Sequence, residues 1–198
     1  MIALIDYRAG NLTSVRKAFA TLGAELYDPV SPRDLDRARA IVVPGVGHFA
    51  ATRALDGEWI HAIRAHVTAG RPLLGICLGL QWLFEGSDEA AECRGLGLLR
   101  GTCYRLKGNG GLKVPHVGWN SLDITREAAI VRSVPSGSQV YFTHSFVAPV
   151  TDDTAAVTEH GEPFAAIVER GNVAGVQFHP EKSGDVGLQI LRNFIDAV

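Results

Sequence analysis

A cysteine flanked by two glycines stands where an apolar segment changes into a helical pattern. Residues 73–81 read Leu-Leu-Gly-Ile-Cys-Leu-Gly-Leu-Gln, so Gly75 and Gly79 lie two positions either side of Cys77. The first part is a short apolar run typical of a buried strand, and apolar residues continue at helical spacing through residues 80–84. The pattern G-x-C-x-G therefore predicts a tight strand-to-helix turn, where larger side chains at the glycine positions would be too crowded.

Such a turn favours a reactive thiol. At the start of a helix, unpaired backbone N–H groups and the positive end of the helix dipole stabilise the thiolate. Cys77 is then a candidate nucleophile, and the N–H of Leu78 is placed to donate to an oxyanion if Cys77 attacks an acyl group. The alternative is that Cys77 is a small buried hydrophobic residue, as a lone cysteine usually is. The turn by itself does not decide between the two.

A histidine and a glutamate near the C-terminus supply what a cysteine nucleophile needs. Residues 179–181 read His-Pro-Glu, and Pro180 disfavours a helical conformation at His179. Because residues two apart in an extended segment point the same way, His179 and Glu181 share a side. The carboxylate can fix the imidazole tautomer, which leaves the other ring nitrogen to exchange a proton with a thiol and a leaving amine. His179 follows a predicted strand, as Cys77 does, and adjacent parallel strands would bring the two together.

Each of these groups also has an interpretation without catalysis. A lone histidine is more often a surface or structural residue, and this applies to His48, His61, His66 and His160. A metal site formed by Cys77, His179 and Glu181 would lack a second nearby histidine or cysteine, so we expect no metal and no cofactor. A cysteine in a tight turn together with a His-x-Glu at a strand end is much harder to assign to packing.

A second glycine turn follows another predicted buried strand, at residues 40–43. Residues 44–49 read Pro-Gly-Val-Gly-His-Phe, so Gly45 and Gly47 flank Val46. Two glycines separated by one residue let backbone N–H groups face a ligand, as in an anion-binding nest. A tight turn without a ligand would explain the glycines equally well.

Size and composition restrict the class of protein. The chain has 198 residues, 46% hydrophobic and 20% charged, which fits one globular α/β domain over residues 1–198. A net charge of −2 gives no electrostatic footprint for nucleic acid or an anionic membrane. The three cysteines are widely spaced, so neither a disulfide framework nor a zinc ribbon is indicated, and Cys93 and Cys103 are expected to be inert. Without a signal-peptide pattern or a membrane-length apolar run, we expect a cytoplasmic protein.

Strands and helices alternate through the first eighty residues. Strands are expected at 2–5, 24–27, 40–43 and 73–77, with helices between them, the signature of a mostly parallel sheet covered by helices on both faces. Ligands of such sheets bind at the carboxyl ends of the strands, where Asn11, Val46 and Cys77 fall.

The pattern changes after about residue 95. Segments 103–106 and 140–147 are interpreted as antiparallel additions to one edge of the sheet. Thr143, His144 and Ser145 lie in the middle of the second segment and need polar partners from protein or ligand. Segments 164–168 and 173–178 predict a hairpin, and Ser183 is expected to cap a final helix.

Three segments together resemble the signatures of class I, triad-type glutamine amidotransferases: residues 44–47, 75–81 and 177–181. Five family-specific segments further resemble the glutaminase subunit of imidazole glycerol phosphate synthase, namely residues 6–7 with 10–12, 44–49, 115–120, 141–146 and 179–183. The match spans nearly the whole chain. One departure is Arg8-Ala9, where many members have a glycine followed by a variable residue, which puts the local turn shape in doubt.

The resemblance implies the flavodoxin-like fold of this family and an activity. Family members hydrolyse glutamine to glutamate and pass the ammonia to a cyclase subunit, which converts PRFAR to imidazole glycerol phosphate and AICAR in histidine biosynthesis. Carried onto this chain, the catalytic residues are Cys77, His179 and Glu181, and the oxyanion donors are the amides of Val46 and Leu78. The residues that would hold glutamine are Gly45, Gly47, Gln81, His144, Ser145 and Phe146.

The resemblance also implies a heterodimer with the cyclase subunit. Asn11, Pro115, Trp119 and Lys182 lie on segments that resemble the docking face of the family, although Trp119 could instead be a core aromatic. Two other functions stay open: the glutaminase of a different synthase, for pyridoxal phosphate or anthranilate, and a non-catalytic binding subunit with the same fold. Residues 115–120 and 182–183 argue against the first, and the intact Cys77, His179 and Glu181 argue against the second.

Overall fold

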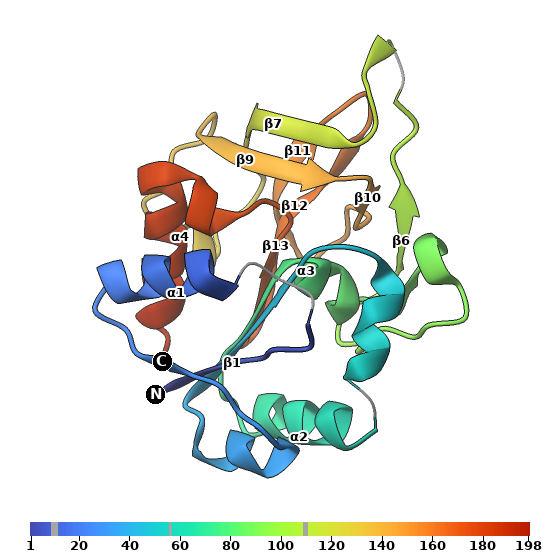
Figure 1. Ribbon diagram of the computed structural model, residues 1–198. Coiled ribbons are helices and arrows are strands. Elements are labelled where there is room, and N and C mark those ends of the chain that lie inside the picture. Colours follow the sequence, from blue (N-terminus) through green and yellow to red (C-terminus); the bar gives the residue numbers. More distant parts are fainter. Residues whose placement is uncertain (9–11, 56, 109–110) are drawn as a thin grey trace.

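A mixed sheet of eight strands runs through the molecule (Figure 1). The computed structural model describes residues 1–8, 12–55, 57–108 and 111–198. The strands follow the order β2-β1-β3-β4-β13-β12-β11-β8. The first five are parallel: β2 (Leu26–Tyr27), β1 (Ile2–Leu4), β3 (Ala40–Gly45), β4 (Leu73–Cys77) and β13 (Val173–Val176). The other three are antiparallel additions: β12 (Pro163–Arg170), β11 (Thr154–Glu159) and β8 (Asp123–Ile124).

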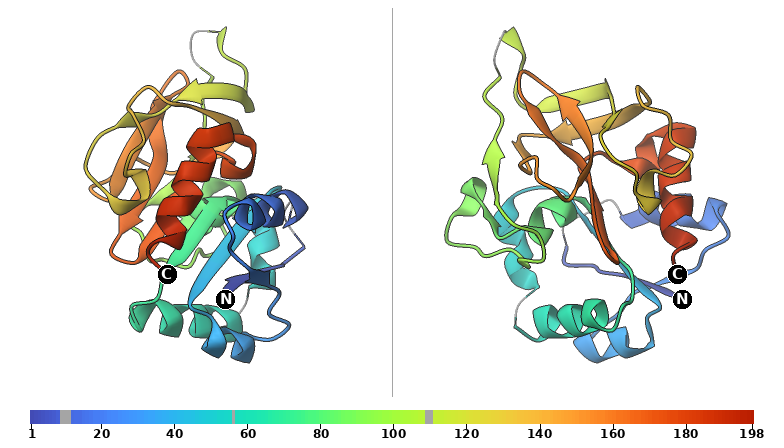
Figure 2. Two further views of the ribbon diagram at one scale, coloured as in Figure 1. Left: turned by 90° about the vertical axis from the view of Figure 1, so that its left-hand side faces the viewer. Right: turned by 180° about the vertical axis from the view of Figure 1, so that it is seen from behind.

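Helices cover both faces of the parallel part (Figure 2). On one face, α1 (Leu12–Thr21) and α4 (Gly184–Ile195) meet through Phe19 and Phe194, whose ring centroids are 6.5 Å apart. The other face carries α2 (Gly57–Thr68), α3 (Leu78–Leu83) and the 3-10 turns η1 (Pro32–Arg37) and η2 (Phe49–Ala54). Successive side chains along a strand point to opposite faces of the sheet, so the strands contribute to the hydrophobic core on each face. Leu4, for example, packs on the first face and Ile5 on the second. The predicted α/β fold with a mostly parallel sheet is confirmed.

Two smaller sheets lie beyond the main one. A ribbon pairs β7 (His116–Ser121) with β9 (Gln139–His144), and a three-stranded sheet joins β10 (Phe146–Val147), β6 (Thr102–Arg105) and β5 (Gly86–Ser87). The prediction that segments 103–106 and 140–147 extend the main sheet is therefore wrong. Alternation identifies a strand but not its partner, and the chain changes sheet at Ser145. Short 3-10 turns elsewhere in the described part of the chain include η3 (Asp88–Ala90), η5 (Ala129–Val131) and η6 (Pro180–Lys182).

The predicted hairpin and the final helix are present. Strands β12 and β13 pair Arg170 with Val173 across a turn, in which Gly171 has a φ of 58°. Ser183 occupies the N-cap position of α4, as predicted, but its side chain makes no capping hydrogen bond to the helix. None of the helices in the described part of the chain has the length and apolar character needed to cross a membrane.

Close backbone contact explains the glycines around Cys77. A β-carbon on Gly79 would lie 1.8 Å from the carbonyl oxygen of Val43, and one on Gly75 would lie 2.6 Å from the carbonyl oxygen of Gly79. The predicted crowding at both positions is confirmed. Helix α3 has only six residues, shorter than the apolar pattern suggested, because Phe84 is already in an extended conformation.

We expect Gly79→Ala to prevent stable folding. The added methyl group would overlap the Val43 carbonyl, and separating α3 from β3 should cost more than the roughly 1–3 kcal/mol of ordinary overpacking. The measurement is the urea midpoint of unfolding. Gly57→Ala is a matched control, since no atom lies within 4 Å of its added methyl group. A near-native midpoint for Gly79→Ala would show that the turn does not require this contact.

Candidate active site

Cys77 ends β4 in a strained turn at the centre of the sheet. Its φ of 54° and ψ of −108° are unusual for a residue with a side chain, and the turn starts α3 at once. Cys77 pairs with Gly45 at the end of β3, so the 45–47 turn lies beside Leu78. The thiol is buried, with 5% of the residue exposed.

His179 and Glu181 reach the site from the neighbouring strand. Strand β13 pairs in parallel with β4, with Val176 opposite Ile76, so the two strands end at the same edge of the sheet. His179 Nδ1 and Glu181 Oε1 are 2.8 Å apart, and the two side chains are only 3% and 2% exposed. The prediction that they share a side is confirmed. Nε2 of His179 is buried and has no hydrogen-bond partner among the described residues.

The surroundings of His179 favour its charged form. Burial alone would lower the pKa of His179, but the interactions with Cys77 and Glu181 outweigh burial and raise the pKa to about 10. The imidazole is therefore protonated at neutral pH between a sulfur and a carboxylate. A protonated imidazole beside the sulfur holds one proton ready for a leaving group.

Ser183 holds the backbone of the His179 turn. Its hydroxyl donates to the His179 carbonyl at 2.7 Å and accepts from the Tyr141 N–H at 2.9 Å. The His179 N–H donates in turn to the Tyr141 carbonyl at 2.9 Å. These bonds use the hydroxyl that was expected to cap α4, and they tie the turn to β9.

A pocket of about 260 Å³ opens beside the cysteine. Its lining includes eight residues predicted from the sequence for catalysis, substrate or docking, namely Val46, Gly47, Cys77, Gln81, Pro115, His144, Ser145 and Phe146. Thr143 and Glu89 complete it. The sequence alone gives no reason to assign Glu89 a role, because this residue lies in a short polar segment without a motif. One of its oxygens accepts from the Phe49 N–H at 2.7 Å, and a carboxylate here suits a ligand ammonium group.

Two glutamines connect the pocket wall to the thiol. The Gln81 amide donates to the Phe146 carbonyl at 2.9 Å and to Gln177 Oε1 at 3.2 Å, which leaves its own oxygen for a ligand. The Gln177 amide lies 3.6 Å from the Cys77 sulfur and donates to it. Gln177 precedes the His-Pro-Glu motif, but only the fold shows that its fully buried side chain turns back to Cys77.

His144 has no free ring nitrogen for a ligand. Its Nδ1 donates to the Phe146 carbonyl at 3.2 Å, and its Nε2 lies 3.1 Å from His116 Nδ1. Burial lowers the pKa of His144 well below the usual range and that of His116 to about 4, so both rings are neutral. Because a carbonyl can only accept, His144 carries its proton on Nδ1 and accepts from His116 on Nε2. The ring therefore braces the Ser145-Phe146 turn.

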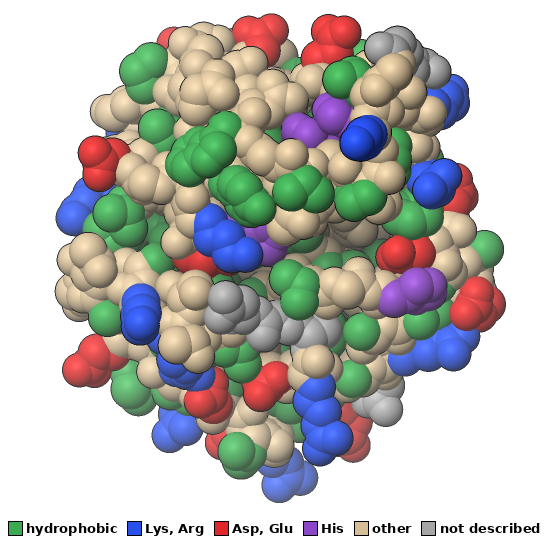
Figure 3. All heavy atoms as spheres, turned by 45° about the horizontal axis from the view of Figure 1, so that its top comes forward, with side chains coloured by type: hydrophobic (Ala, Val, Ile, Leu, Met, Phe, Trp, Pro, Cys, Tyr) green, Lys and Arg blue, Asp and Glu red, His purple; other side chains and the backbone are tan. Residues whose placement is uncertain are grey.

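The ribbon of β7 and β9 exposes an apolar face. Trp119 is 57% and Val117 58% exposed, so the core alternative for Trp119 is wrong. Trp119 pairs with Tyr141, and the Lys182 Nζ lies 5.8 Å from the Tyr141 ring centroid. Figure 3 shows hydrophobic side chains gathered across this side of the molecule. Pro115 is also exposed, whereas Asn11 lies outside the described residues.

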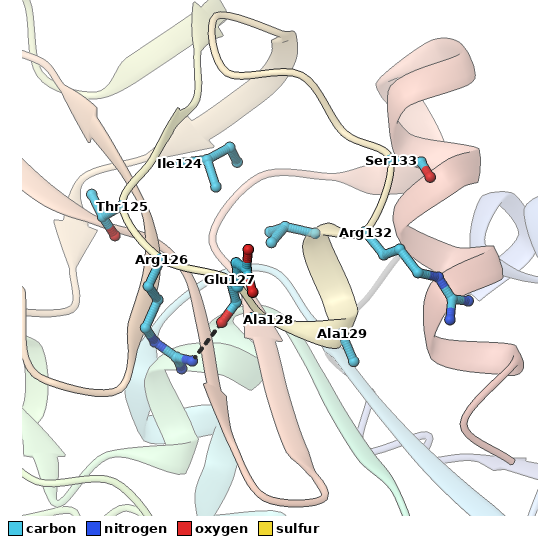
Figure 4. Close-up of a pocket in the computed structure, with 9 residues that line it drawn as sticks. Ile124, Thr125, Arg126, Glu127, Ala128, Ala129, Arg132 and Ser133 are labelled. Carbon is cyan, nitrogen blue, oxygen red and sulfur yellow. Dashed lines mark hydrogen bonds between the residues drawn. The ribbon is translucent and has the colours of Figure 1, made fainter.

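A larger cavity, about 760 Å³, follows the loop from Ile124 to Ser133 and shares no lining residue with the cysteine pocket (Figure 4). Of its two arginines, Arg126 donates to backbone carbonyls, including those of Glu127 and Asp153, and Arg132 pairs with Asp196. Its lining contains neither a cysteine nor a histidine, whereas the cysteine pocket contains both.

Comparisons with known proteins agree with this geometry. The family model for glutamine amidotransferase class-I matches residues 3–198. The chain belongs to the class I glutamine amidotransferase family. A Moorella thermoacetica relative, imidazole glycerol phosphate synthase subunit HisH, is 44% identical over 201 residues, covering 100% of this chain and 95% of the relative. The Arabidopsis thaliana imidazole glycerol phosphate synthase hisHF, chloroplastic, is 41% identical over 201 residues, which cover 98% of this chain and 34% of the plant protein.

The fold of this class I glutamine amidotransferase recurs at low identity. A crystal structure of a glutamine amidotransferase matches with a TM-score of 0.78 at 19% identity, covering 100% of this chain and 98% of the other. The family assignment agrees with the resemblance predicted from residues 44–47, 75–81 and 177–181.

In this amidotransferase we expect Glu181→Gln to slow the reaction of Cys77 with iodoacetamide at pH 7. Glu181 helps to raise the pKa of His179, so a neutral amide should lower that pKa and leave the imidazole beside the sulfur uncharged more often. The alkylation rate against pH, with the His179 ring titrated by NMR, measures both effects. Glu92→Gln removes an exposed carboxylate as a control. If the pKa of His179 were unchanged in Glu181→Gln, Glu181 would not be the group that raises it.

Proposed function

We propose that this protein is the glutaminase subunit of imidazole glycerol phosphate synthase. It hydrolyses glutamine to glutamate and ammonia for a cyclase subunit that converts PRFAR to imidazole glycerol phosphate and AICAR. The observation that carries the proposal is the buried His179–Glu181 pair beside Cys77, which itself lines a small polar pocket. The names of the relatives at 41% and 44% identity support the choice of synthase.

Glutamine binds with its side-chain amide at Cys77. The Gln81 oxygen is free to accept from the substrate, and the free oxygen of Glu89 suits its α-ammonium group. Gly47 lines the pocket without a side chain, and Ser145 and Phe146 form another part of its wall. Gly45 does not line the pocket, and its missing side chain leaves room for Tyr7 and Leu78. The pocket of about 260 Å³ suits a small amino acid.

The reaction proceeds by acyl transfer to sulfur. The Cys77 thiolate attacks the amide carbon, and the N–H groups of Val46 and Leu78 stabilise the oxyanion. His179 gives its Nε2 proton to the departing nitrogen, which leaves as ammonia. Water then attacks the thioester, His179 takes up its proton, and glutamate departs as the thiolate re-forms. Glu181 keeps the imidazole oriented throughout.

The partner docks on the exposed face of β7 and β9. Trp119, Lys182 and Pro115 lie around this face, and Thr143 belongs both to the ribbon and to the pocket lining. Exposed aromatic side chains next to a cation are typical of interface hot spots. The plant relative is named hisHF, and this chain matches 34% of it, which leaves room for a fused cyclase.

The decisive variant is Cys77→Ala, assayed with the cyclase and PRFAR. It should abolish glutamine-dependent formation of imidazole glycerol phosphate and leave the ammonia-dependent reaction intact, since the cyclase accepts ammonia directly. Cys93→Ala, another buried cysteine, is the matched control and should keep both reactions. Loss of both reactions in Cys77→Ala would indicate a structural cysteine, and glutamine turnover in that variant would place the nucleophile elsewhere.

Trp119→Ala tests the docking face. Truncating a central aromatic residue should cost about 2 kcal/mol or more of binding, roughly thirtyfold in Kd for the cyclase. Isothermal titration with the wild-type and variant subunits measures the loss. The matched control is Leu112→Ala, which truncates an exposed residue outside the ribbon. Equal affinities for Trp119→Ala and wild type would move the interface away from β7.

A further inference from the structure

The hydroxyl of Tyr7 is buried beside the site without a hydrogen bond. Tyr7 follows β1 and is 6% exposed, and its Oη has no partner among the described residues. A buried unpaired hydroxyl lowers stability, and phenylalanine would fill the same space without that cost. Burial, followed by the charge of Cys77, raises the pKa of Tyr7, so the oxygen keeps its proton as a donor.

Tyr7 Oη lies directly against the turn that carries the oxyanion donor. A β-carbon built on Gly45 would be 2.1 Å from Tyr7 Oη and 2.7 Å from Leu78 Cβ. Tyr7 belongs to the apolar group of α2 and α3, with Phe49 and Leu78, and does not line the pocket. The hydroxyl therefore approaches Gly45 from the interior, while Val46 faces the pocket.

The peptide between Gly45 and Val46 links these two sides. In a planar trans peptide the N–H and the C=O point in opposite directions. When the Val46 N–H points at the oxyanion above Cys77, the Gly45 carbonyl must point away from the pocket, toward the interior. A carbonyl turned inward needs a donor, and the unpaired hydroxyl of Tyr7 is the donor at that position.

We infer that Tyr7 is a positioning residue for the oxyanion donor: its hydroxyl donates to the Gly45 carbonyl when the Val46 N–H turns toward the oxyanion. The inference rests on the proposed function, because it assigns Val46 to that role. The hydrogen bond forms in the transition state and is absent at rest. Tyr7 thereby lowers the barrier to acylation while it costs the resting protein stability.

Tyr7→Phe tests this with three readouts. In the complex with the cyclase and PRFAR, kcat for glutamine should fall about tenfold, as expected for one hydrogen bond made only in the transition state, with KM unchanged. Alkylation of Cys77 by iodoacetamide should keep its rate, because sulfur displaces iodide from a saturated carbon and no oxyanion forms. The thermal midpoint should be equal to or higher than that of the wild type.

Tyr27→Phe is the matched control. The Tyr27 hydroxyl donates to the Asp34 carbonyl at 2.7 Å, so this variant should lose thermal stability and keep kcat. Wild-type kcat in Tyr7→Phe would overturn the inference, as would a lower thermal midpoint or an equal slowing of alkylation. Absence of glutamine turnover in the wild-type complex would instead overturn the proposed function.

Discussion

Backbone contact between β3 and α3 is the constraint on which the site depends. Only a hydrogen atom fits between Gly79 and the Val43 carbonyl, and this contact brings the first residues of α3 against the end of β3. The same approach places Gly45 beside Leu78, which sets the spacing of the two proposed oxyanion donors. Cys77 has to take a positive φ to join strand and helix this closely, at a cost of about 1–3 kcal/mol. The fully buried strands on either side stabilise the turn against that strain.

Burial disfavours the charged form of His179, and interactions with neighbouring groups offset this effect. The ring is nearly inaccessible to water, yet its interactions with Glu181 and Cys77 keep it protonated. A buried pair of this kind is sensitive to geometry, because either group without its partner would be an uncompensated charge. The two bonds of Ser183 and the bond from His179 to Tyr141 fix the backbone that carries the pair.

The sequence predicted the proposed catalytic groups better than their surroundings. Cys77, His179 and Glu181 follow local rules of turn, strand end and alternation, and parallel pairing of β4 with β13 brings them together. The partners of short strands depend on the whole fold, so the separate ribbon of β7 and β9 was missed. Gln177 and Glu89 reach the site through contacts across the chain, which no local pattern encodes. Arg8 stands where many family members have glycine, and it adopts the conformation that glycine favours, with a φ of 62°. The Asp6 side chain accepts a hydrogen bond from the Arg8 N–H.

The two faces of the β7–β9 ribbon connect the proposed docking surface with the proposed substrate pocket. Alternation places Val117 and Trp119 outward, while His116 on the same strand turns inward to His144. His144 then braces Phe146 at the pocket wall, and Thr143 lies between the two regions. A partner seated on Trp119 would therefore lie close to the pocket, from which ammonia would leave in the proposed reaction. A small neutral product is easily lost to water, so the side that binds the partner has to be the side where the pocket opens.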